Sequence, residues 1–238
     1  MDLQRLMSIT RKAIDDYHMI EDGDKIAIGI SGGKDSLSLL CALAGLRRFY
    51  PKKFELCAVT VDLGFGIQDF TRIENLCKEL EVPYDIITTE ISQIVFKDRK
   101  ESNPCSLCAK MRKGALNEAM KRNGCNKIAY AHHKDDMVET MLMSLIYEGR
   151  IHTFSPRTYL DRIDLTVIRP FLYVQEADII GFVNKNHIPV AKSKCPVDGY
   201  TKREYVKQLL RNLNLENPGV KDRMFTAITT REIWKDER

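Results

Sequence analysis

Residues 25–36 read KIAIGISGGKDS, and this stretch decides the expected fold. Lys25–Ile30 is a short apolar β-run, Ser31–Ser36 follows it directly, and a helix-like segment, Leu37–Phe49, comes next. A strand, a glycine-rich loop and a helix in succession place free backbone N–H groups at a helix start, where anions bind. The stretch therefore predicts an α/β domain with a phosphate site at Ser31–Ser36, to which Lys34 adds positive charge.

Strands and helices alternate along the rest of the chain. Further strands are expected at 54–61, 84–88, 127–131 and 166–169, and helices at 3–19, 69–80, 105–121, 132–149 and over most of the chain after Gln175. This alternation is typical of a doubly wound α/β fold, here with a mainly parallel five-stranded sheet. We expect an N-terminal helix within 1–24, a central domain at 25–172 and a helical C-terminal extension at 173–238. Ligands of such sheets bind beyond the carboxyl ends of the strands, where SGGKDS, Asp62 and HHKDD (132–136) fall.

The composition is that of an ordinary globular protein. Of 238 residues, 44% are hydrophobic and 29% are charged, which argues against disorder, collagen-like repeats and coiled coil. No apolar run approaches the ~18 residues of a membrane span, and the charged N-terminus does not resemble a signal peptide. We therefore expect a cytoplasmic protein. The net charge of +4 is too small to indicate nucleic acid by itself.

The two polar motifs each allow a second interpretation. The first lacks the Ser or Thr directly after Lys34 that a Walker A loop uses, and it does not match G-x-G-x-x-G; a capped strand–helix turn is the alternative. In the second motif Asp135 and Asp136 fall near a helix start, where carboxylates suit the helix dipole and could bind magnesium. Capping alone is the alternative there. His132 and His133 are expected to divide between shaping a nucleotide pocket and a structural role.

The cysteines suggest a metal cluster. Seven is an odd number, which argues against a disulfide framework. Cys105 and Cys108 form the single C-x-x-C, whereas structural zinc sites usually draw on two such pairs. With Cys195 as third ligand the set fits a 4Fe–4S cluster with one iron left open, where sulfide could bind; a redox pair or unlinked thiols are the alternatives. The remaining cysteines, expected in the core, are Cys41, Cys57, Cys77 and Cys125.

A family resemblance rests on these motifs. SGGKDS (31–36) and AHHKDD (131–136) resemble the signatures of the PP-loop ATP pyrophosphatase superfamily. The longer string AHHKDDMVET (131–140), with a C-x-x-C before it and a lone cysteine after it, resembles the tRNA 2-thiolation branch, notably the 2-thiocytidine synthetases. The second cysteine that tends to follow the last ligand in those enzymes is absent after Cys195. We expect neither terminal zinc-binding module of the 2-thiouridine relatives here, so the target nucleoside stays open, with cytidine favoured.

The resemblance implies a PP-loop fold, a chemistry and a set of site residues. ATP adenylates the C2 carbonyl oxygen of a tRNA pyrimidine, sulfur replaces that oxygen, and AMP and pyrophosphate are released. The residues implied to bind ATP are Gly29, Ser31, Gly32, Gly33, Lys34, Asp35, Ser36, Val61, Ala131 and Asp136. The residues implied to be catalytic are Cys105, Cys108, Cys195, Asp136 and Arg112. The three cysteines would ligate the 4Fe–4S cluster, and Asp135 or Asp136 would ligate magnesium.

Basic side chains gather on both sides of the cysteines. Those expected to contact the tRNA backbone are Lys97, Arg99, Lys100, Lys113, Lys192, Lys194, Lys202 and Arg203. Phosphate contacts supply affinity but read no sequence, and a solvated face is the alternative. The expected partners are tRNA, a sulfur donor (sulfide or a cysteine desulfurase) and a second copy of the chain. Two rival functions are a PP-loop tRNA-modifying ligase without sulfur chemistry and a non-catalytic iron–sulfur protein that binds tRNA or senses sulfur.

Overall fold

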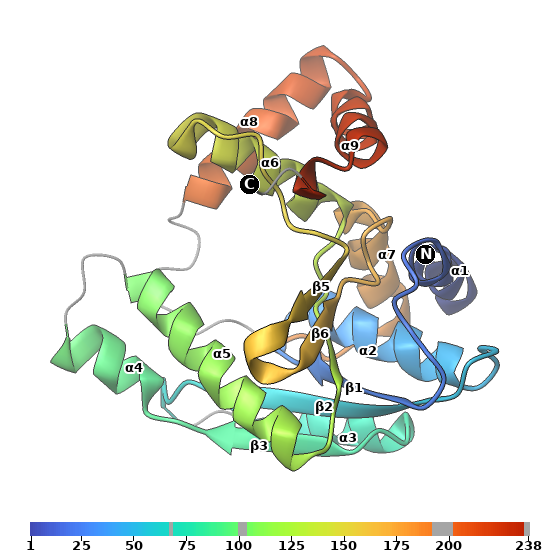
Figure 1. The fold of residues 1–238 in the computed structure, drawn as a ribbon, viewed down its shortest axis with the longest axis vertical. Helices are drawn as coiled ribbons and strands as arrows, with labels where there is room; N and C mark the ends of the chain where they lie inside the picture. The colour runs from blue at the N-terminus through green and yellow to red at the C-terminus, as the bar shows by residue number, and fades with distance from the viewer. Residues whose placement is uncertain (67–68, 100–103, 192–201, 236–238) are drawn as a thin grey trace.

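A six-stranded sheet organises the chain. The computed structural model describes residues 1–66, 69–99, 104–191 and 202–235. Within them the strand order is β3-β2-β1-β4-β6-β5, and every neighbouring pair is parallel except β5 with β6 (Figure 1). The strands are β1 (Asp24–Gly29), β2 (Phe54–Asp62), β3 (Tyr84–Thr88), β4 (Lys127–Ala129), β5 (Arg157–Leu160) and β6 (Leu165–Ile168).

The expectation of a mainly parallel α/β sheet is confirmed, but the count of five strands is wrong. The sixth strand is β5, which pairs antiparallel with β6 from Arg157 opposite Ile168 to Leu160 opposite Leu165. It is a four-residue edge strand with alternating exposure, and Tyr159 is 58% exposed. Short, half-exposed edge strands carry little apolar signal, because only one face is buried.

Helices cover both faces of the sheet (Figure 1). The helices of the described residues are α1 (Leu3–Asp16), α2 (Lys34–Arg47), α3 (Thr71–Glu79), α4 (Ile91–Gln93), α5 (Pro104–Arg122), α6 (Lys134–Glu148), α7 (Glu176–Asn186), α8 (Lys202–Glu216) and α9 (Val220–Arg231). A π-helical turn, η1 (Ile94–Asp98), and two 3-10 turns, η2 (Asp161–Ile163) and η3 (Ile233–Lys235), complete them. Helix α2 begins at Lys34, three residues before the expected start, so the second half of SGGKDS is helical.

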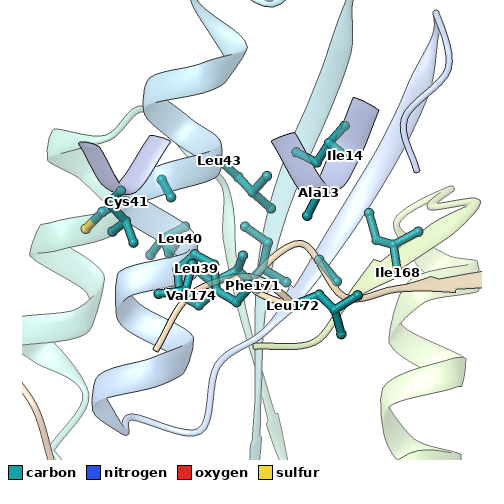
Figure 2. Close-up of a cluster of buried hydrophobic side chains, with 14 of the residues drawn as sticks. Ala13, Ile14, Leu39, Leu40, Cys41, Leu43, Ile168, Phe171, Leu172 and Val174 are labelled. Carbon is teal, nitrogen blue, oxygen red and sulfur yellow. The ribbon is translucent and has the colours of Figure 1, made fainter. Parts of the chain in front are cut away.

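The main core lies on one face of the sheet. Side chains from α1, from α2 and from the loop after β6 converge there, as Ile14, Leu40 and Phe171 illustrate (Figure 2). The other face is covered by α5, whose Leu116 and Met120 pack on β-strand residues. Since helices flank both faces, the sheet is doubly wound, as the alternation predicts. Three of the four expected core cysteines, Cys41, Cys57 and Cys77, are buried, and Cys125 is half-buried.

The C-terminal helices continue the main core. Helices α8 and α9 lie beside α6 (Figure 1), and their buried residues Val206, Leu210, Phe225 and Ile228 belong to the same apolar cluster as α2. The expected division at residues 24/25 and 172/173 stays a prediction. In the described ranges, no helix combines the length and the apolar character that crossing a membrane requires.

Candidate functional site

Hydrogen bonds of Ser31 and Ser36 fix the backbone of the glycine-rich loop. Ser31 N donates to Ser36 Oγ (3.2 Å), Gly33 N donates to Ser31 Oγ (3.3 Å), and Ser36 Oγ donates to Gly33 O (3.1 Å). Gly32 has φ +79°, a conformation that favours glycine. Gly33 is the N-cap of α2 and receives no side-chain cap. The first N–H groups of α2 are therefore arranged as in a phosphate-binding helix start.

Two charged side chains complete the loop. Lys34 Nζ lies 3.0 Å from Asp35 Oδ1 and 3.1 Å from Glu176 Oε1. Burial acts to lower the pKa of Lys34, but these two carboxylates outweigh it and raise that pKa. Asp35 Oδ1 is buried and, among the described residues, accepts no well-aligned hydrogen bond. A buried carboxylate oxygen left without a hydrogen bond beside a phosphate site suits a magnesium ligand.

The HHKDD segment caps helix α6. Asp136 N donates to His133 Nδ1 (3.3 Å) and His133 N donates to Asp136 Oδ2 (3.0 Å), which together form a capping box. Asp135 Oδ2 accepts from Glu176 N (2.8 Å), and Asp135 Oδ1 pairs with Lys221 (2.9 Å). Capping, offered as the alternative interpretation of these carboxylates, is thus present. Asp136 Oδ1, which the capping box does not use, forms an ion pair with a cation.

That cation comes from the C-terminal extension. Arg203 Nη1 lies 3.0 Å from Asp136 Oδ1 and 3.4 Å from Glu139 Oε2, and Lys207 Nζ lies 3.3 Å from Glu176 Oε1. Arg203, expected to contact tRNA, is therefore engaged by two carboxylates of α6. Glu139 is 2% exposed, and burial raises its pKa to about 7. Glu139 lies within AHHKDDMVET but was given no role there, and Glu176 belongs to no sequence motif, so sequence reasoning missed both.

The residues expected around the nucleoside come from three adjacent strands. Gly29 ends β1, Val61 lies near the end of β2, and Ala131 follows β4 by two residues. Tyr130 packs beside Gly29, and the charge of Arg112 on α5 acts on the Tyr130 hydroxyl. Arg112, in the third turn of α5, therefore lies near this same edge of the sheet.

A half-buried cluster of aromatic and basic side chains, which sequence reasoning missed, lies beyond β4 and β6. Arg169 Nε donates to His132 Nδ1 (3.3 Å), and the Arg169 guanidinium lies 5.0 Å from the centroid of the Phe154 ring. The His132 ring stacks on the same Phe154, with centroids 5.0 Å apart. Burial, then the charge of Arg169, lowers the pKa of His132 to about 4, so His132 is neutral at pH 7. No local pattern marks Arg169, since its partners are distant in sequence.

The cysteine pair occupies the first turn of α5. Cys105 is exposed and Cys108 is half-buried, and residues three apart on a helix share one side. Arg112 follows one turn later and is exposed. Within the described ranges no three His, Cys, Asp or Glu side chains gather as a metal site. Cys195, the expected third ligand, lies outside the described residues.

The described basic residues expected to bind tRNA are spread over three elements, η1, α5 and α8. Lys97 and Arg99 lie at the end of η1 and Lys113 lies on α5, all three exposed. Lys202, at the start of α8, stands 4.6 Å from the centroid of the Tyr147 ring. Lys100, Lys192 and Lys194 fall outside the described ranges. An exposed basic surface is available, and its role stays a prediction.

The loop, the capped helix and their place beyond the strand ends define an α/β nucleotide-binding protein. A family model described as PP-loop domain matches residues 5–213. A tRNA-cytidine(32) 2-sulfurtransferase of Geobacter sulfurreducens is 39% identical over 228 residues, covering 94% of this chain and 89% of the relative. The enzyme of the same name from Geobacter metallireducens is 40% identical over 221 residues, covering 91% and 86%. The chain therefore belongs to the PP-loop family and, within it, to the family of the tRNA-cytidine(32) 2-sulfurtransferases.

The solved structures support the fold. The U34-tRNA thiolase NcsA from Methanococcus maripaludis, a structure with a [4Fe-4S] cluster, superposes with a TM-score of 0.77 at 22% identity, over 99% of this chain and 79% of that one. An NH3-dependent NAD synthetase from Campylobacter jejuni gives a TM-score of 0.50 at 16% identity, over 100% and 95%. The fold is thus shared by proteins with different printed activities.

Proposed function

We propose that this protein is an ATP-dependent tRNA sulfurtransferase that replaces the C2 oxygen of a cytidine with sulfur. Its relatives carry the name tRNA-cytidine(32) 2-sulfurtransferase and match more than nine-tenths of the chain. The C2 oxygen is a poor leaving group until it is joined to AMP. The oxygen attacks the α-phosphorus of ATP and pyrophosphate leaves; sulfur then attacks C2 and AMP leaves.

The chain's own residues serve the first step. The N–H groups at the start of α2 and Lys34 bind the phosphates, and the negative charge that develops there is stabilised by the loop and by magnesium. Asp35, whose Oδ1 pairs with Lys34 but accepts no well-aligned hydrogen bond among the described residues, is the ligand best suited to magnesium, with Asp136 as its partner. ATP and magnesium would compete with the contacts of Lys34 to Glu176 and of Arg203 to Asp136.

The observation that supports the sulfur chemistry concerns the described residues on either side of the segment with Cys195. Ala191 N, four residues before Cys195, donates to Gly32 O in the glycine-rich loop (2.9 Å). Arg203, eight residues after Cys195, pairs with Asp136 (3.0 Å). Both described flanks of this segment are therefore tied to the nucleotide site, which supports a thiol acting beside ATP.

Cys105 and Cys108 fit a cluster by their donor chemistry, since thiolates on one side of a helix turn can share a metal group. Three cysteine ligands would leave one iron of a 4Fe–4S cluster open, and that iron supplies a place to hold sulfur. We also propose that sulfide or a cysteine desulfurase delivers the sulfur and that the chain forms a homodimer. Lys97, Arg99 and Lys113 are proposed contacts for the tRNA backbone.

The test uses anaerobically reconstituted protein with ATP, magnesium, sulfide and unmodified tRNA. We expect about four iron and four sulfide per chain, release of AMP and pyrophosphate that depends on tRNA, and 2-thiocytidine in the digested tRNA. Cys105→Ala together with Cys108→Ala is expected to retain ATP binding and to form no thionucleoside. If wild type forms a modified nucleoside that contains no sulfur, and this variant still forms it, a ligase without sulfur chemistry would be favoured. Stoichiometric zinc without iron would remove the cluster from the proposal.

A further inference from the structure

Arg169 has an unusual environment for an arginine. It follows β6 directly, at the carboxyl edge where ligands of α/β sheets bind. Its side chain is half-buried, and its Nη1 donates to Ser155 O and to Thr158 Oγ1 (3.4 Å). Its Nε donates to neutral His132. These contacts fix the guanidinium in one orientation without neutralising it.

A counter-ion for Arg169 is missing among the residues that the structure describes. Each hydrogen bond that it makes there goes to an uncharged acceptor, and no ion pair includes it. Burial lowers the pKa of Arg169 to about 10, so the side chain still carries its charge at pH 7. Buried charges in proteins are normally paired with an opposite charge or a ligand. By contrast, Lys34, Arg203 and Lys207 at this edge each contact a carboxylate.

The cluster around Arg169 connects to the nucleotide site. Tyr130 N donates to Ile168 O (3.0 Å), which joins the β4 end to the β6 end. The Tyr130 ring packs beside Gly29 on one side and lies 5.7 Å, centroid to centroid, from His132 on the other. The charges of Asp136 and Arg203 in turn act on the pKa of His132, in opposite directions. Arg169 thus stands at the end of a continuous row of side chains that begins at the strand of the glycine-rich loop.

We infer that Arg169 is an anion-binding residue of this site and that its ligand is a phosphate group of a substrate. Nε and Nη1 are engaged by the contacts above, so among the described residues Nη2 keeps its two N–H donors for phosphate oxygens, in a fixed plane that lysine does not reproduce. The phosphate belongs either to ATP or to the tRNA backbone, and both sources share this chemistry. The inference rests on the proposed function, because that function supplies these two substrates.

The test measures binding, without thiolation, for Arg169→Gln, Arg169→Lys and the matched control Arg157→Gln. Arg157 lies on β5 of the same hairpin, is exposed and donates to His18 O (3.0 Å), away from the cluster. One arm titrates wild type and variants with ATP and magnesium in the absence of tRNA. The other titrates them with unmodified tRNA in the absence of ATP, at several salt concentrations.

We expect Arg169→Gln to weaken one of these affinities by about tenfold or more, as loss of a hydrogen bond to a charged group does. Arg169→Lys should retain part of the affinity, and Arg157→Gln should change neither. Weakened ATP binding alone identifies a nucleotide phosphate; weakened tRNA binding with a shallower salt dependence identifies a backbone phosphate. Unchanged affinities in a folded Arg169→Gln or Arg169→Lys protein, or an equal loss in Arg157→Gln, would overturn the inference. These titrations do not measure thiolation. Absence of 2-thiocytidine with wild type in the reconstituted assay would therefore count against the proposed function alone.

Discussion

Replacing Glu139 by glutamine should change how the stability of the nucleotide-free protein depends on pH. The ordinary glutamate pKa is 4.5, and burial raises that of Glu139 to about 7. As pH rises between these values the unfolded chain loses a proton that the folded chain keeps, so unfolding becomes easier. At ~1.4 kcal/mol per pH unit, the wild-type free energy of unfolding falls by up to about 3 kcal/mol across this window. A glutamine side chain cannot ionise, so the variant lacks this loss.

The assay is urea unfolding of wild type and Glu139→Gln at about pH 4.5, 6 and 8 without ATP or magnesium, which brackets the window between the two pKa values. We expect the variant to gain stability relative to wild type as pH rises, by up to about 3 kcal/mol between the lowest and the highest pH. The control is Glu148→Gln, which removes an exposed carboxylate from the same helix and should show no such gain. A difference between wild type and Glu139→Gln that is constant with pH would refute the reasoning. So would a variant that loses stability at the highest pH, because the pairs with Arg203 and Lys207 would then outweigh burial.

Two further substitutions test the scaffold. Lys127→Met should lower the free energy of unfolding by about 3–5 kcal/mol, because it leaves Asp24, 4% exposed and 2.6 Å from Lys127, as a buried carboxylate without its cation; a urea midpoint near that of wild type would contradict this. Gly64→Ala should cost about 1–3 kcal/mol by thermal unfolding, because φ is +78° and a Cβ would stand 2.6 Å from Thr89 O. Gly66→Ala, with φ +99° and open space around it, separates backbone strain from the clash, and equal losses in the two variants would exclude the clash.

Local patterns are sufficient to predict the loop and the helices beside it. SGGKDS joins β1 to α2, and HHKDD caps α6, because small residues and short polar side chains act on neighbouring backbone groups. Strand β3 matches its expected bounds, 84–88. Some helix ends differ: the first helix stops at Asp16, not Met19, because His18 adopts the left-handed conformation (φ 47°) and Met19 N donates to Ile14 O (3.0 Å).

What the sequence does not predict depends on contacts between distant residues. Glu176 reaches Lys34 from a remote part of the chain, and Arg169 reaches His132 over 37 positions. Nothing near either residue in the sequence marks it, since its partners are assembled by the sheet. For Arg203 the sequence is misleading. Its basic run indicates a solvated or tRNA-binding face, whereas in the fold Arg203 pairs with Asp136 and Glu139.

The most direct test of the account asks whether a thiol at position 195 acts at the nucleotide site. In a strain lacking this protein, plasmids carrying wild type or Cys195→Ala are compared by mass spectrometry of tRNA nucleosides, and each purified protein is titrated with ATP. The account predicts 2-thiocytidine with wild type, none with Cys195→Ala, and equal ATP affinity for both. Undiminished 2-thiocytidine with Cys195→Ala would contradict it.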